Sequence, residues 1–162
     1  MIYTISDVFV AGEYLSNCAK YFAPKFYPVE EDTKNQYEKM CSLYSQGKPF
    51  PVSSINCVNI IYPTNEDNII FRAWHDMMHF ITDKSFNPSC EPSVYRAQKM
   101  QLAQWYFSRF SDEKLFKLLA LVLESETVGQ VSYEQENEKF PENQVEFCLK
   151  WINNKFRYNY IL

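Results

Sequence analysis

The feature that most constrains the fold is an apolar segment in the middle of the chain, residues 69–81, that carries a narrow stripe of polar side chains. At helical spacing the rest of this segment is apolar almost all round, which is typical of a buried helix. Polar residues three and four positions apart share one helical face. Burying them is costly unless they are hydrogen-bonded, ion-paired or bound to a metal. The stripe consists of Arg72, His75, Asp76 and His79.

Helical patterns also cover most of the remaining chain, which has only three glycines. Capping residues and helix breakers predict six helices, over residues 6–23, 30–46, 64–82, 89–110, 112–136 and 142–157. We expect residues 50–63 to be irregular, with residues 57–62 as a candidate strand that lacks a visible partner. The sequence therefore predicts a compact all-α fold, one domain over residues 1–162 built as a bundle of about six helices.

Composition narrows the class of protein. Apolar residues make up 46% and aromatic residues 17% of the chain, which excludes general disorder. The net charge of -4 argues against a broad phosphate-binding surface, so nucleic acid is not an expected partner. The five cysteines form no CxxC pair and predict reduced thiols. With no secretory signal and no apolar stretch long enough for a membrane span, we expect a cytoplasmic protein.

The two histidines of the chain are the leading metal ligands. His75 and His79 lie about one helical turn apart, so both imidazoles can bind one ion. On the helix over residues 112–136, a projection at about 100° per residue puts Glu126 on the core-facing stripe and Glu124 on the opposite side. Zn or Fe(II) held by His75, His79 and Glu126 would keep the open positions that catalysis requires.

Further residues are candidates for supporting roles. Asp76 or Glu91 could act as general base or extra ligand, and Arg72 completes the candidate catalytic set. Candidate cofactor contacts or orienting residues are Gln98, on the face of Glu91, and Gln130 and Tyr133, on or beside the stripe of Glu126. Gly129 would permit the close approach of a neighbouring helix or ligand.

A purely structural interpretation of the same residues stays open. The two histidines would then form hydrogen bonds within the core. Glu126 would pair with Arg72 or another arginine, and Glu91 would favour the start of its helix through the helix dipole.

The sequence His75-Asp-Met-Met-His79 resembles the HExxH motif of the zincin metalloproteases, in which two histidines bind zinc and the glutamate activates water. In this resemblance Asp76 takes the place of the glutamate, and Glu126 matches the third ligand. The pair His75-Asp76 is also similar to the dipeptide of HD-domain phosphohydrolases, but no histidine precedes it. Residues 76–79 resemble one ExxH half of a ferritin-like di-iron site, but no second histidine is left for the other half.

A longer pattern, Arg-x-Trp-His-Asp-x-x-His, looks similar to small uncharacterised phage-encoded proteins, as do residues 128–133 and 140–144. The function predicted first is a metal-dependent hydrolase, with Zn or Fe at a mononuclear site and a small-molecule or peptide substrate. Two alternatives stay open. One is a non-enzymatic helical protein that binds a host partner in the host cytoplasm, and the other is a non-haem iron oxygenase.

Overall fold

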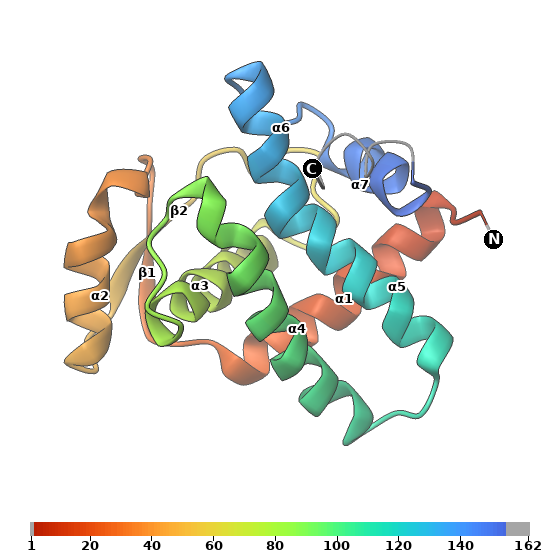
Figure 1. Cartoon of the computed structure of the whole chain (residues 1–162), viewed down its shortest axis with the longest axis horizontal. Helices are drawn as coiled ribbons and strands as arrows, with labels where there is room; N and C mark the ends of the chain where they lie inside the picture. The colour runs from red at the N-terminus through yellow and green to blue at the C-terminus, as the bar shows by residue number, and fades with distance from the viewer. Residues whose placement is uncertain (1, 155–162) are drawn as a thin grey trace.

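The computed structural model describes residues 2–154, which form helices and one small sheet (Figure 1). The helices are α1 (Ile5–Phe22), α2 (Tyr37–Ser45), α3 (Asn65–Ile81), α4 (Glu91–Phe107), α5 (Glu113–Glu124), α6 (Gln130–Asn137) and α7 (Gln144–Ile152), with short 3-10 turns at Lys34–Gln36 and Pro88–Cys90. One π-helical turn, Ser125–Gly129, joins α5 to α6 without a break. Counted with α5 and α6 as one helix, residues 2–154 contain six helices, and the prediction of an all-α fold is confirmed.

Helix α3 lies against α1 and α4 and supplies much of the core. Trp74, Met77 and Met78 on this helix are buried, as its apolar sequence predicts. The helix starts after Thr64, whose side-chain hydroxyl accepts a hydrogen bond from the backbone N–H of Asp67. This cap satisfies one of the otherwise unpaired N–H groups of the first turn and fixes where the helix begins.

The π-helical turn packs directly against α7. A Cβ atom at Gly129 would lie 3.0 Å from the indole ring of Trp151, so only glycine allows this approach without a shift of the ring. The predicted close contact at Gly129 is confirmed, with α7 as the neighbouring helix. Within the turn, the Thr127 hydroxyl donates to the carbonyl of Leu123 at 2.8 Å.

A strand–helix–strand unit was not predicted. Strands β1 (Phe26–Val29) and β2 (Phe50–Ser53) pair in parallel, with Phe26 opposite Phe50 and α2 as the connection. This unit stands to one side of the other helices (Figure 1). The helix expected over residues 30–46 is thus shorter, and residues 57–62 are bends, not a strand. Each strand has only four residues, one of them proline, and finds its partner about twenty residues away, so local patterns did not reveal the pairing.

Several helix ends also differ from the prediction. The cap of α1 is Thr4, with Asp7 completing a capping box, instead of Ser6. Because a 3-10 turn comes before α4, this helix begins at Glu91. The predicted end of the last helix, near residue 157, lies outside the described residues. No helix in the described part of the chain is long and apolar enough to span a membrane.

Candidate metal centre

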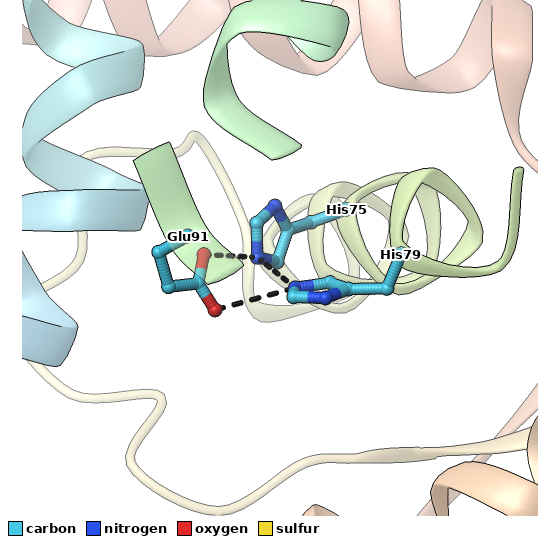
Figure 2. Close-up of side chains that lie close together, drawn as sticks. All are labelled: His75, His79 and Glu91. Carbon is cyan, nitrogen blue, oxygen red and sulfur yellow. Dashed lines mark hydrogen bonds and ion pairs between the residues drawn. The ribbon is translucent and has the colours of Figure 1, made fainter. Parts of the chain in front are cut away.

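Three ligand-type side chains meet where α3 lies against the start of α4 (Figure 2). The Nε2 atoms of His75 and His79 are 3.2 Å apart. Glu91 places Oε2 3.2 Å from Nε2 of His75 and Oε1 3.2 Å from Nε2 of His79. Among residues 2–154, this is the group of ligand-type side chains close enough to hold one ion, with ligand atoms within 4.8 Å of one another.

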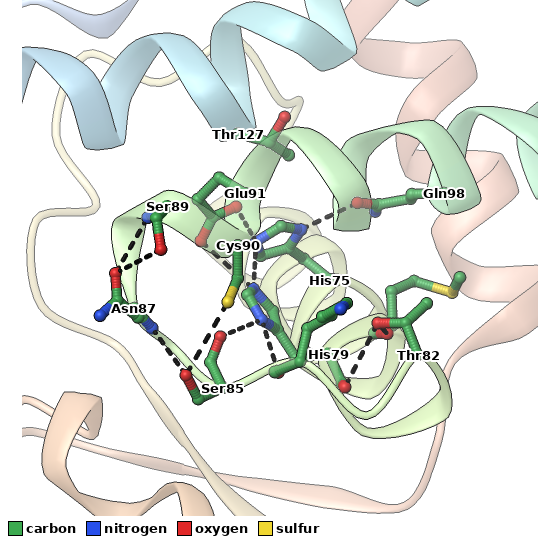
Figure 3. A network of polar contacts seen from close by, with 12 residues as sticks. His75, His79, Thr82, Ser85, Asn87, Ser89, Cys90, Glu91, Gln98 and Thr127 are labelled. Atoms are coloured by element: carbon green, nitrogen blue, oxygen red, sulfur yellow. Dashed lines mark hydrogen bonds and ion pairs between the residues drawn. The ribbon is translucent and has the colours of Figure 1, made fainter.

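The other ring nitrogen of each histidine has a hydrogen-bond acceptor (Figure 3). Nδ1 of His79 lies 3.1 Å from the carbonyl oxygen of Lys84 and 3.0 Å from that of Ser85. Nδ1 of His75 lies 2.8 Å from Oε1 of Gln98. Carbonyl oxygens only accept, so these contacts put a proton on each Nδ1 and leave Nε2 for the centre. Such outer partners orient histidines that bind metals.

The lone pairs of both Nε2 atoms and of the Glu91 carboxylate therefore meet in a buried place. The Glu91 side chain is buried, and Nε2 of His75, 3.2 Å from Oε2, can donate to it only when that nitrogen carries a proton. Lone pairs of two imidazoles and a carboxylate repel one another unless a cation lies between them, either a proton or a metal ion. The 3.2 Å between the Nε2 atoms is close to the edge of about 3.3 Å in a tetrahedron with zinc–nitrogen bonds of 2.0–2.1 Å. The geometry is thus compatible with a transition metal.

The electrostatics also favour positive charge at this point. Burial would lower the pKa of His75, but the charge and hydrogen bond of Glu91, the hydrogen bond of Gln98 and the charge of Asp76 raise it to about 9. Burial would raise the pKa of Glu91, but both imidazoles hold it down at about 2. Without a metal, a proton on His75 supplies the positive charge, and a metal ion would have to displace it.

A pocket of about 420 Å³ lies beside these residues. The Asp76 carboxyl lines the pocket next to the two histidines. Burial raises the pKa of Asp76 to about 6, although His75, His79 and Arg72 act to lower it. This carboxyl is therefore mostly ionised at neutral pH, yet more basic than an ordinary aspartate, which suits a general base.

Glu126 lies on another wall of the same pocket and is not part of the cluster. Its Oε1 accepts a hydrogen bond of 2.9 Å from Nε2 of Gln130. Burial raises the pKa of Glu126 to about 8, against the lowering effects of Tyr62, Arg72 and Gln130. The acid that lies with the two imidazoles is therefore Glu91, not the expected Glu126, because the 3-10 turn before α4 carries Glu91 to the imidazoles while Gln130 holds Glu126 in place.

Two other candidates have orienting roles in the structure. Arg72 donates to the backbone carbonyls of Ser53, Ile55 and Asn56, at 2.9, 2.6 and 3.2 Å. These bonds attach the loop after β2 to α3, so Arg72 positions this loop, and its expected catalytic role stays a prediction. Gln98 is fully buried and contacts Nδ1 of His75, so it orients this imidazole.

Tyr133 is not among the residues that line the pocket, and its ring packs against Phe147 at 5.4 Å between centroids. The expectation of a cofactor contact is therefore wrong, because it assumed a regular helix after Glu126. A π-helical turn holds more residues per turn, so Glu134 and Gln135 come to the pocket face in place of Tyr133. Gln130 does line the pocket.

Sequence patterns could not reveal the two backbone carbonyls that orient His79. They belong to Lys84 and Ser85 in the loop directly after α3, and no side chain of this loop takes part in the contact. Glu91, in contrast, was visible as an acid in a first helical turn, a position that many acids occupy for the helix dipole alone.

Comparisons of this chain with protein-family models, with curated proteins and with solved structures found no match. The resemblances to zincins and to phage-encoded proteins therefore stay predictions.

Proposed function

We propose that this protein is a metal-dependent hydrolase whose ion is held by His75, His79 and Glu91. The observation that carries the proposal is the convergence of both Nε2 atoms and a buried carboxylate, each 3.2 Å from its neighbour, with both Nδ1 atoms engaged elsewhere. Two imidazoles and a carboxylate suit zinc or iron(II) and leave coordination positions open. A pocket beside the site gives a substrate access to those positions.

The residues of the chain divide the chemical work between them. A bound zinc or iron(II) ion would polarise a substrate and make a coordinated water more acidic. Asp76 would accept the proton of the attacking water and pass it to the leaving group. Gln98 and the carbonyls of Lys84 and Ser85 keep the imidazoles in the tautomer that binds metal.

Two alternatives use the same residues differently. A non-haem iron oxygenase would have the same ligand set. It predicts iron at the site and turnover that consumes oxygen. A non-enzymatic interaction protein would use the cluster as a buried polar network. It predicts that neither metal nor loss of Asp76 changes its behaviour.

Metal analysis of protein purified without a histidine tag tests the proposal first. We expect about one zinc or iron per chain, and Glu91→Gln and His79→Ala variants that fail to retain it. The proposal would be overturned if the folded wild type bound transition metals no more tightly than a variant in which both histidines are replaced.

Hydrolysis of a panel of activated esters and amides then tests the reaction. We expect Asp76→Asn to keep the metal and to lose at least about 100-fold in turnover, the usual contribution of a general base. The exposed Glu113→Gln serves as the control, because this residue lies on α5 outside the pocket. Equal turnover in Asp76→Asn and the wild type would show that another group takes the proton.

A further inference from the structure

The pocket beside the metal centre is lined by more acidic than basic side chains. Its acids come from four separate segments, so they surround the space and are not a run on one helix face. The acidic residues are Asp32, Asp76, Glu91, Glu126 and Glu134, and the basic ones are Lys34 and Arg72. Such a lining repels anionic ligands and concentrates cationic ones.

Both basic residues are already engaged by the protein. The Lys34 ammonium pairs with Glu134, lies 3.9 Å from Asp32 and sits over the ring of Phe140. The guanidinium of Arg72 is bound to three backbone carbonyls. Among the lining residues, neither offers an unengaged positive group to a phosphate or carboxylate. An anionic substrate would therefore have to depend on the metal alone.

Glu126 lacks the counter-charge that Glu91 has. Its Oε1 accepts a hydrogen bond of 2.9 Å from the neutral amide of Gln130, and the structure shows no ion pair to Glu126 within residues 2–154. The Gln130 amide is itself 3.5 Å from Oε1 of Gln144, so neutral amides continue along this wall. Burial raises the pKa of Glu126, and the charge of Arg72, which is bound to backbone carbonyls, offsets this only in part, as expected for a carboxyl without an ion pair.

The pocket is also large enough to hold a ligand that reaches both acids. Glu91 lines it, is 5% exposed and is already paired with the imidazoles, at 3.2 Å from Nε2 of each, so of Glu91 and Glu126 it is Glu126 that lacks an ion pair. The pocket volume of about 420 Å³ is in the range of small-molecule sites, about 300–1,000 Å³. A ligand of this size can contact both walls at once.

We propose that the substrate carries a primary ammonium group, which Glu126 binds while the reacting group lies at the histidine centre. This inference rests on the proposed hydrolase function, because it names the substrate class of the same pocket. The ammonium could belong to a free small amine or to a lysine side chain or N-terminus of a peptide. In both cases it would supply the charge that Glu126 lacks, and the amide of Gln130 would hold the carboxylate in position.

Hydroxamates of matched length test the proposal, because the hydroxamate group binds the metal and leaves the far end to report on Glu126. Zinc-loaded protein is titrated with alkyl hydroxamates that end in an ammonium, a carboxamide or a carboxylate, over chains of three to six methylenes. We expect the best ammonium compound to bind about tenfold more tightly than the carboxamide, and the carboxylate to bind most weakly, which corresponds to one favourable charge contact. Equal affinities, or a preference for the carboxylate, would overturn the inference.

The Glu126→Gln variant assigns the preference to this residue. It should bring the ammonium compound to the affinity of the carboxamide and change the carboxamide by less than about twofold, within the spread of a neutral contact. Glu113→Gln, outside the pocket, should keep the full preference. A Glu126→Gln protein that still prefers the ammonium would show that another acid receives it, and would overturn the assignment.

Two further arms separate the possible sources and the possible failures. A short peptide hydroxamate with the same ammonium group should bind more tightly than the alkyl hydroxamate if the natural substrate is a peptide. It should bind more weakly if the natural substrate is a free small amine. Both results support a substrate with an ammonium group. Metal-free protein is also titrated with the alkylammonium compounds that lack the hydroxamate. Binding there that depends on Glu126, with no zinc uptake, would overturn the hydrolase but support the ammonium site. Zinc uptake without any ammonium preference would support the metal site and overturn the ammonium site.

Discussion

Glu91 and Glu126 are carboxyls in the walls of one pocket, and their surroundings move their pKa values in opposite directions. Glu91 faces two imidazoles, which hold its pKa at about 2 in spite of burial. Glu126 faces a neutral amide, and burial raises its pKa to about 8. The same chemical group is thus a permanent anion at one wall and a weak acid at the other.

The difference shows what each wall is suited for. A carboxylate that stays ionised beside two imidazoles can bind a metal at any physiological pH. Burial of an ionised carboxyl without a partner cation costs free energy, and a cationic ligand would offset this cost. Sequence alone cannot make this distinction, because it shows two glutamates in helical segments but not the groups that each meets in the fold. If the two walls have these separate roles, matched variants of Glu91 and Glu126 should lose different properties.

The largest difference is expected in metal affinity. Glu91→Gln removes the anionic ligand and should weaken zinc binding by more than about 100-fold, since loss of even an outer partner costs about 10- to 100-fold. Glu126→Gln has the same change in size and charge at the opposite wall and should bind zinc within about threefold of the wild type. Competition with a chromophoric chelator measures both. Equal losses in the two variants would show that the walls are not separate.

The pH dependence of zinc binding is the next largest effect. The pKa of His75 is raised to about 9, so below this pH zinc must displace one proton. Affinity should therefore rise about tenfold per pH unit, or about 100-fold from pH 6 to pH 8, and level off above pH 9. Calorimetry in buffers of different ionisation enthalpy measures the released proton. Zinc binding that is independent of pH would show that His75 is already neutral in the metal-free protein.

The same two glutamates show which features of the site could be predicted from the sequence and which could not. The polar stripe on a buried helix predicted α3, its Thr64 cap and both histidines, because each is a property of local spacing. Glu126 was preferred to Glu91 because a projection at constant pitch favours a residue in mid-helix. That projection could not anticipate the π-helical turn, nor the 3-10 turn that aims Glu91 at the imidazoles.

The strand–helix–strand unit shows the same limit. Pairing between Phe26 and Phe50 depends on contacts between distant segments, and a four-residue strand has too few positions to display an alternating pattern. The packing of Met40, Phe50 and Phe80 stabilises the unit against α3. Local sequence predicted the elements that fold by their own periodicity and missed those that depend on a partner.

A smaller change in affinity is expected for the residue that orients His75. Gln98→Leu removes the acceptor for Nδ1 and should weaken zinc binding by about tenfold, the lower end of the range for outer partners. Gln101→Leu is the matched control one turn away, because Gln101 accepts a hydrogen bond from the Trp74 indole and has no contact with the histidines. Both variants lose some stability, but only Gln98→Leu should change affinity. If both weaken zinc binding alike, the effect comes from packing.

The smallest effect concerns the stability of the metal-free protein. The Glu126 carboxyl ionises near 4.5 in the unfolded chain and near 8 in the folded one, so between these pH values the folded state binds the extra proton. Stability therefore falls as pH rises from 4.5 to 8, by up to a few kcal/mol after screening by pocket water. His75, with a folded pKa of about 9, contributes loss in the same direction from about pH 6.5 upwards, so the wild-type slope alone cannot identify the cause. Glu126→Gln should flatten the slope between pH 4.5 and 8 and leave the parts due to Asp76, whose pKa is raised to about 6, and to His75, as measured by urea denaturation across that range. Parallel curves for the variant and the wild type would mean that a cation pairs with the ionised Glu126 in the folded protein and that its pKa is not raised. The two walls would then be electrostatically alike.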